Sequence, residues 1–525
     1  KCDQGKPKCE RCINARLVCE GYPEPVAYRF HVHALATSEP QRPSPSSSLT
    51  PAAASKRDRA EAVPRRLDTQ ISADVTERWY FGLVLQATRG GVALHVQNIS
   101  PVLTNIIPQL AYHHGAIRHA LIALGASYHL YKTSGARTRA TWHRPSMSSL
   151  ETFILQHYTR AARELRVAID STKPESSTVA LMCCLIFVFL ENLRANHKGA
   201  AMHLQNGISI LEAAVDFEKL YPPDSTQPAI HDSSTSALPL LSTGELRGLT
   251  NYMHQLEMST GLFWTALPLR LASRIHTGPP RNGLARQLPE RFTSLAEAHA
   301  ARSQFSRDLT QRDTRLRGHR GDVAFWTRAE VKAEHAAMCQ YAAQLAERYT
   351  RFMADEAVAP AKGTRAIVSA YTDLLLISSM RCRLELTPFR SAEHGAVQET
   401  PAFRVILEDM IRYGELLHEA RKDAARTAAL PAGTLDFAVE VGLVAPMYYA
   451  FVYTSDAVSR RRILKVMSHT ETREGPWDAQ ALLKLISVMA QPEKQEGGAP
   501  VNPLRRWGGA TDCMGLFTHL DISEW

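Results

Sequence analysis

Beyond about Thr76 the chain shows the 3.6-residue hydrophobic period of amphipathic α-helices. One predicted apolar face consists of Ile117, Ala120, Leu121, Leu124, Tyr128 and Tyr131. A second consists of Tyr158, Ala161, Ala162, Leu165 and Val167, and a third of Ala201, Leu204, Ile208 and Leu211. Helical patterning recurs over residues 329–351, 367–386, 403–419 and 434–454. Convincing alternating strands are lacking, so the pattern predicts an all-α fold, a large helical array of antiparallel neighbours.

The segment Val179–Leu193 is apolar on nearly every side, which predicts a helix buried at the centre of that array. Its longest apolar run, Val179 to Leu190, has 12 residues, fewer than the roughly 20 needed to cross a bilayer. We therefore expect no membrane partner. Cys183 and Cys184 lie in this run and are expected to be unreactive packing residues.

Two interruptions are predicted to be disordered insertions, near residues 222–244 and 300–322. The first is rich in Pro, Ser and Thr. The second carries a run of arginines from Arg302 to Arg320 interleaved with Asp308 and Asp313, so an exposed charged helix is the alternative there. Aromatic residues are not interleaved with these arginines, which argues against nucleic-acid binding by this run.

The composition is that of a globular protein: 525 residues, 45% hydrophobic and 22% charged. A net charge of +9 favours polyanionic partners without establishing one. Nine cysteines, an odd number in a large chain, do not indicate a disulfide framework. The expected compartment is therefore reducing, the cytosol or the nucleus.

Four of the nine cysteines lie at the start of the chain, at Cys2, Cys9, Cys12 and Cys19. A CxxC pair with flanking cysteines at equal distances is the spacing that thiolate coordination of zinc requires. Basic side chains lie between these cysteines, among them Lys6, Lys8 and Arg11, and could face phosphates. A redox CxxC pair or a chance cluster is the other interpretation.

The stretch from Lys1 to Cys19 resembles the second two-thirds of the fungal binuclear zinc cluster, a six-cysteine, two-zinc DNA-binding module. The resemblance implies that Cys2, Cys9, Cys12 and Cys19 correspond to its third to sixth zinc ligands. It also implies DNA contact by Lys1, Lys6, Lys8 and Arg11, with Lys1 reaching base edges in CGG-type half-sites.

The first two cysteines of that pattern, and the basic helix that follows them, are not in this sequence. We therefore expect the sequence to begin inside a longer protein or an incomplete gene model. In the family the first and fourth cysteines bridge the two zinc ions, and of these only the fourth, Cys9, is present. The chain alone is expected to hold fewer than two zinc ions and to bind CGG-containing duplexes negligibly.

These patterns predict three parts: a partial zinc cluster at 1–24, a linker at 25–75 and a helical regulatory domain at 76–525. Within the linker, Ser38–Ser55 is rich in Pro and Ser and is predicted to be a flexible tether. Basic residues follow it at Lys56, Arg57, Arg59, Arg65 and Arg66. They form a nuclear-import signal or phosphate contact, or else a solvated basic spacer.

The body resembles the regulatory domain that follows the zinc cluster in many fungal transcription factors. The resembling stretches are 107–110 with 117–129, 191–211 and above all 442–478. The resemblance implies control of transcription through co-regulators or the transcription machinery, and a small-molecule effector for the helical core. Pro446 is expected to kink an apolar helix, with Arg460–Arg462 capping the bend or pairing with acidic neighbours such as Asp456. Simple packing and surface roles are the alternative.

Signatures of common enzymes are absent: the sequence has no GxGxxG, no GxxxxGK[ST] and no GxSxG. Histidines at His31, His33, His113, His114 and His203 suggest metal binding but are interpreted as surface or satisfied core residues. We therefore expect no enzymatic activity, and a metal-dependent hydrolase is a remote third class.

Together these features predict a nuclear, zinc-dependent, DNA-binding RNA polymerase II transcription regulator of fungal type, whose helical body regulates its activity. Its zinc is structural. The alternative is a helical scaffold that binds proteins or a metabolite without binding DNA in this form.

Overall fold

The computed structural model describes most of the helical body. The described residues are 71–72, 74–90, 102–133, 149–169, 173, 175–221, 238, 240–264, 267–275, 288–319, 322–355, 364–388, 400–427, 437–438, 442–454, 456–470 and 473–489. All of them belong to one compact unit, residues 63–525.

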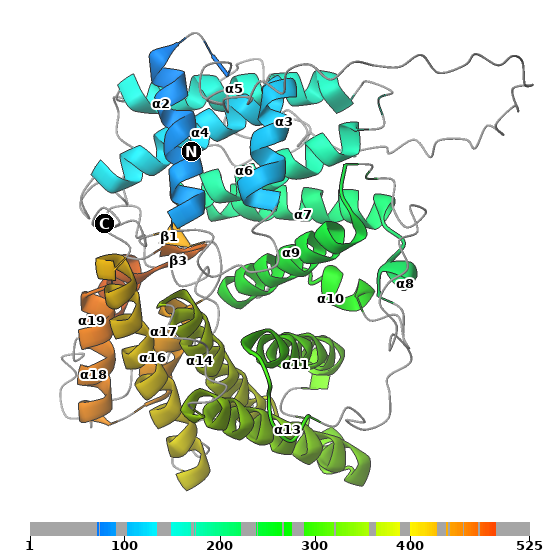
Figure 1. The fold of residues 1–525 in the computed structure, drawn as a ribbon. Helices are drawn as coiled ribbons and strands as arrows, with labels where there is room; N and C mark the ends of the chain where they lie inside the picture. Colours follow the sequence, from blue (N-terminus) through cyan, green and yellow to red (C-terminus); the bar gives the residue numbers. More distant parts are fainter. Residues whose placement is uncertain are drawn as a thin grey trace, which may run out of the picture. The chain divides into compact units, whose positions relative to one another are not determined.

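The first half of this unit is a series of helices (Figure 1). They are α2 (Val75–Gly90), η3 (Val102–Ile106), α3 (Ile107–His113), α4 (Gly115–Thr133), α5 (Ser149–Ile169), α6 (Ser176–Leu193), α7 (His197–Ala214), α8 (Phe217–Leu220), α9 (Thr243–Phe263) and α10 (Leu271–Arg274). Local chemistry fixes several of their starts. The Asn196 side chain accepts a hydrogen bond from Gly199 N, and Ser242 and Glu245 form a reciprocal capping box at α9.

Helix α6 forms the centre of the first half. By length and composition it could cross a membrane, but 89% of its apolar window is buried inside the protein, as in the core helix of a globular domain. It packs against α4, α5 and α7, and α4 packs in turn against α2 and α5. The buried apolar side chains of these helices, together with those of α9, form a continuous N-terminal core from Ile71 to Ile275.

The second half is also helical, with three very short strands (Figure 1). Its elements are α11 (Leu295–Leu316), η4 (Arg317–His319), α12 (Val323–Trp326), α13 (Ala329–Ala354), α14 (Thr364–Leu386), α16 (Pro401–Thr427), β1 (Phe437–Ala438), α17 (Val444–Tyr453), α18 (Ala457–Ser468), β2 (Arg473–Glu474), β3 (Trp477–Asp478) and α19 (Ala479–Met489). Strand β2 pairs parallel with β1 and antiparallel with β3. Gly475 turns the chain between β2 and β3 with φ 58°, a conformation that favours glycine.

A C-terminal core occupies the second half, from Phe263 to Ile486. Helix α14 packs against α13 and α16, and α17, α18 and α19 continue the layer. Trp477 is its largest fully buried side chain. The all-α prediction is confirmed, and the helices expected from the apolar faces around residues 117–131, 158–167 and 201–211 are α4, α5 and α7.

The predicted disordered insertion at 300–322 is wrong for residues 300–319, which continue α11 and form η4. Arg302 and Arg312 are only 6% and 4% exposed, because carboxylates from other helices pair with them. Such pairing allows arginine to line the buried face of a helix. For the other insertion, α9 begins at Thr243, and residues 222–237 lie outside the described ranges.

The expected kink at Pro446 is also wrong. Helix α17 begins at Val444, so Pro446 lies in its first turn, where a backbone N–H would have no partner within the helix. The predicted pairing of these arginines with acidic residues is found for Arg462, which pairs with Glu408 and Glu415 of α16. Asp456 instead caps α18 by accepting a hydrogen bond from Ser459 N.

Candidate functional site

Every site residue predicted from the sequence lies outside the described ranges. This holds for the zinc ligands Cys2, Cys9, Cys12 and Cys19, the DNA-contacting Lys1, Lys6, Lys8 and Arg11, and the basic residues Lys56, Arg57, Arg59, Arg65 and Arg66. The zinc-binding, DNA-binding and nuclear-import predictions therefore stay predictions.

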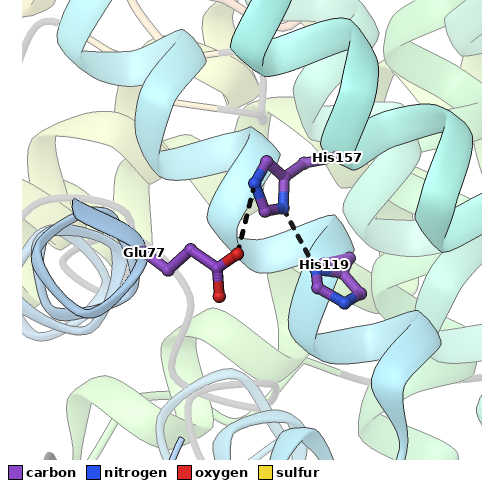
Figure 2. A group of neighbouring side chains, drawn as sticks. All are labelled: Glu77, His119 and His157. Atoms are coloured by element: carbon purple, nitrogen blue, oxygen red, sulfur yellow. Dashed lines mark hydrogen bonds and ion pairs between the residues drawn. The ribbon is translucent and has the colours of Figure 1, made fainter. Parts of the chain in front are cut away.

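The helical body brings together a different group, Glu77, His119 and His157, from three helices (Figure 2). Nδ1 of His119 lies 3.0 Å from Nδ1 of His157. On the other side of the His157 ring, Nε2 lies 3.6 Å from the Glu77 carboxylate. One possible ligand atom from each of the three residues falls within 4.8 Å of the other two. Within the described ranges it is the one group of three or more His, Cys, Asp and Glu residues that meets this spacing.

The close approach of α2 to α4 positions this group. Glu77 lies in the first turn of α2, and His119 lies near the start of α4. A Cβ atom on Gly125 would lie 2.1 Å from the backbone oxygen of Tyr80, so glycine is required where the two helices cross. This crossing brings the carboxylate of α2 to the two imidazoles.

Burial shifts both imidazoles towards the neutral form. Burial lowers the pKa of His119 to about 4; Arg160 also lowers it, whereas Glu164 opposes that shift. Burial likewise lowers the pKa of His157, against the opposing effect of Glu77. Since a neutral imidazole carries one N–H and one lone pair, each ring can donate one hydrogen bond and accept one, or bind an ion.

A carboxylate lies behind the His119 ring as well. Glu164 is 3.6 Å from Nε2 of His119 and accepts a hydrogen bond from Nε of Arg160 at 3.2 Å. Its negative charge favours a proton on Nε2 of His119, which leaves the Nδ1 lone pair directed at His157. The cluster can therefore share a proton between its rings or bind a cation.

A second buried charge cluster is structural. Asp373 of α14 pairs with His299 and Arg302 of α11 and accepts a hydrogen bond from the hydroxyl of Tyr349. Burial raises the pKa of Asp373, but His299 and Arg302 outweigh it and hold the pKa at about 2. Each of its charges is paired, so this cluster fastens α11 and α13 to α14.

The turn between β2 and β3 joins the two halves of the unit. Arg473 donates from Nη1 to the backbone oxygens of Asn192 and Leu193, each at 2.9 Å, at the carboxyl end of α6. Its guanidinium also pairs with Asp478 and lies over the Tyr131 ring. The residues that carry the resemblance at 442–478 thus include a contact between the N-terminal and C-terminal halves.

The neighbouring Glu474 is fully buried, and its carboxylate holds the start of α17. It accepts hydrogen bonds from the backbone N–H groups of Gly442, Leu443 and Val444, and it pairs with Arg421. These N–H groups have no partner within the helix, and the positive end of the helix dipole favours a carboxylate there. Strand β2, which leads into the glycine–tryptophan turn, therefore contacts both the end of α6 and the start of α17.

One pocket among the described residues is small for a small-molecule effector. A pocket of about 230 Å³ opens between α13, α14 and α16, lined by Cys339, Arg381, Glu385 and apolar neighbours. Ligand sites usually occupy roughly 300–1,000 Å³. Burial raises the pKa of the Cys339 thiol to about 11, so this thiol is not activated as a nucleophile. The effector predicted for the helical core stays a prediction.

Other histidines and cysteines fit the interpretation made from the sequence. The His203 ring bonds the hydroxyl of Tyr158 at 2.8 Å, as a satisfied core residue does. Cys183 and Cys184 are buried, and burial raises the pKa of both thiols, so they are unreactive packing residues as predicted.

No sequence signal identified the Glu77–His119–His157 group. Its members come from three helices separated by long stretches of chain, whereas the spacing motifs of metal sites are local. His119 lies near the apolar Ile117 on the inner face of α4. The periodicity of α4 therefore predicts that His119 is buried, but it does not predict its partners.

Two matches with known proteins bear on the helical body. Residues 95–253 match the family described as the fungal specific transcription factor domain. The transcription regulator lscL of Purpureocillium lilacinum is 26% identical over 251 residues, which are 46% of this chain and 52% of that protein. The chain thus spans about half the length of the curated relative it matches. No solved structure matches the chain. The two matches support a fungal transcription-factor regulatory domain and a role in regulating transcription.

Proposed function

We propose that this chain is the regulatory body and part of the DNA-binding module of a nuclear, zinc-dependent RNA polymerase II transcription regulator. Cys2, Cys9, Cys12 and Cys19 bind zinc, and Lys1, Lys6, Lys8 and Arg11 contact CGG-type DNA in the complete cluster. The helical body acts on co-regulators or the transcription machinery.

One observation carries the proposal, the order of the two features along the chain. A zinc-type cysteine pattern at residues 2–19 precedes a helical body whose residues 95–253 match the fungal specific transcription factor domain. Either feature alone is weak, because CxxC pairs and helical arrays both occur in unrelated proteins. A relative that is a transcription regulator supports the same proposal.

The regulatory role is tested by tethering. Residues 1–525 are fused to a heterologous DNA-binding domain whose sites lie upstream of a reporter gene in a fungal host. We expect the fusion to change reporter output at least fivefold relative to the DNA-binding domain alone, upwards for an activator and downwards for a repressor. An unchanged reporter with a stably expressed fusion would favour the scaffold alternative.

The zinc-binding role is tested separately. Cobalt substituted into the chain should give intense thiolate-to-metal absorption, because cysteine sulfurs bind the ion. Replacing Cys2, Cys9, Cys12 and Cys19 by serine should abolish that band, while replacing the buried Cys382 by alanine should leave it. A chain without a thiolate band would exclude the cysteine cluster and leave the regulatory role to the tethering assay.

A further inference from the structure

We propose that Glu77, His119 and His157 form a second metal site, which takes a divalent ion such as Zn²⁺ and fastens α2 to α4 and α5. This site uses nitrogen and oxygen donors and is separate from the cysteines at the start of the chain. Two imidazoles and a carboxylate are a donor set that zinc commonly takes in proteins.

The spacing of the donor atoms suits one ion. Two ligands about 2.0 Å from a tetrahedral zinc lie about 3.3 Å from each other. The two Nδ1 atoms are 3.0 Å apart, and the Glu77 carboxylate is 3.6 Å from the His157 ring. The largest separation in the set is below 4.8 Å, so modest closure brings all three donors to one centre.

The His157 ring has to turn for this closure. In the structure it lies between its partners, with Nδ1 towards His119 and Nε2 towards Glu77 (Figure 2). When the ion binds, one nitrogen of the His157 ring has to face the point between His119 Nδ1 and the Glu77 carboxylate. The 3.6 Å separation from Glu77 exceeds a hydrogen-bond distance, so no strong bond opposes the movement of that carboxylate.

The surroundings prepare His119 as a ligand. Metal-bound histidines usually donate their other ring N–H to a carboxylate, which orients the ring and strengthens its lone pair. Glu164 lies on that side of the ring, 3.6 Å from Nε2 of His119, so a small approach would let it accept this N–H; Arg160 pairs with Glu164. Glu164 is thus a positioning residue, separated from the ion by the His119 ring.

Charge in the cluster also favours a dication. The charged groups that face the two rings are Asp74 and Glu77 from the start of α2, and Arg160 and Glu164 from α5. Three carboxylates and one guanidinium leave an excess of negative charge beside the two rings. An ion with two positive charges offsets that excess.

The test uses the full chain in which Cys2, Cys9, Cys12 and Cys19 are replaced by serine, so that the thiolates do not contribute. This protein is titrated with Co²⁺ and with Zn²⁺. We expect one Co²⁺ per chain with visible d–d bands and no thiolate band, and one Zn²⁺ with Kd on the order of 1 µM. Hydrogen exchange at residues 74–80 should slow when Zn²⁺ is added, because the ion draws Glu77 towards the rings.

Matched variants assign the ligands. Glu77→Gln and His119→Gln should each weaken Zn²⁺ binding at least 100-fold, and Glu164→Gln about 10–100-fold, as for a residue that orients a ligand. His203→Gln, at another largely buried histidine, should leave binding unchanged. Because Glu77 lies near the surface, its variant is expected to remain folded, as circular dichroism would check.

Absence of bound metal in the serine-substituted chain would overturn the proposal. So would binding that Glu77→Gln and His119→Gln leave intact, because the ion would then lie elsewhere. The proposed transcriptional role stands or falls by the tethering assay, independently of either result.

Discussion

Replacing Glu474 by glutamine is the most direct test of how the C-terminal half is held together. The Glu474 side chain is 0% exposed, so water cannot replace any partner that it loses. Its Oε2 accepts hydrogen bonds from the N–H groups of Gly442 and Val444, at 2.8 and 2.9 Å. Its Oε1 accepts from Leu443 N at 2.8 Å and from Arg421 Nη1 at 2.9 Å.

The expected loss of stability follows from this count. A glutamine has one acceptor oxygen, so in either orientation its NH₂ group faces two donors, and two of the four hydrogen bonds disappear. Hydrogen bonds to a charged group contribute about 1.5–3 kcal/mol each. Loss of the negative charge also leaves the buried Arg421 without its carboxylate, which costs about 3–5 kcal/mol for buried pairs. Since these contributions overlap, we expect a loss of about 3–5 kcal/mol in the free energy of unfolding.

Differential scanning fluorimetry and hydrogen exchange measure this effect. The helical body of roughly 400 residues is expected to unfold in one transition, and its unfolding entropy is about 2.1 cal/mol/K per residue. Each kcal/mol therefore shifts Tm by about 1 °C, so Glu474→Gln should lower Tm by about 3–6 °C. Exchange should accelerate first in α17, whose start the carboxylate holds. Glu419→Gln is the matched control, because its ion pair with Lys422 is exposed and contributes little. A shift no larger than that of the control would refute the anchoring role of Glu474.

Three further outcomes are expected. Gly125→Ala should speed hydrogen exchange in α2 and cost about 1–3 kcal/mol of stability, because the new Cβ would lie 2.1 Å from the Tyr80 carbonyl oxygen. Burial lowers the pKa of His203 to about 4 and of His197 to about 3. The unfolded chain therefore binds more protons below about pH 6.5. Each histidine should reduce the free energy of unfolding by about 1 kcal/mol at pH 5.5, measured by Tm against pH, and the effect should be smaller in His203→Gln. Arg462→Ala should cost about 1 kcal/mol in denaturant unfolding, because its glutamate partners are 54% and 37% exposed and water partly screens both pairs.

The sequence predicts the helices of the N-terminal half well because their buried faces are apolar. Helix α6 is the clearest case: nearly every side chain from Thr178 to Leu193 is buried, and the sequence there is almost uniformly hydrophobic. Periodicity detects such elements without any knowledge of their partners.

The sequence did not predict the packing of α11, because its buried face carries charged side chains. Its inner face includes Arg302 and Arg312, and charged side chains indicate solvent when read along a single chain. Their burial depends on carboxylates of other helices, Asp373 on α14 and Glu334 on α13. Pairing across helices is a property of the tertiary structure, so local periodicity carries no trace of it.

The two candidate metal sites show the same contrast. The cysteines at residues 2–19 are recognisable because the ligands of such a cluster lie close together in sequence. The group of Glu77, His119 and His157 is assembled by helix packing, and each residue alone is unremarkable in sequence. The group forms only because α2 and α4 cross closely, which Gly125 permits.

The consecutive pair Arg473 and Glu474 suggests how the two halves of the helical body could influence each other. Arg473 binds the last carbonyl oxygens of α6, inside the segment that matches the fungal transcription factor domain, while Glu474 binds the first N–H groups of α17 in the C-terminal core. Arg473 and Glu474 are consecutive residues of the two-residue strand β2, so a displacement of one is expected to move the other. Arg473→Lys should weaken the contact with α6 and leave the contact of Glu474 with α17 in place. Lysine keeps the charge but lacks the planar guanidinium that reaches Asp478 and α6 together. We expect that variant to unfold in two transitions where the unaltered protein shows one, with the C-terminal transition unchanged because Glu474 still holds α17. A single cooperative transition in Arg473→Lys would show that apolar packing, rather than this arginine, couples the halves.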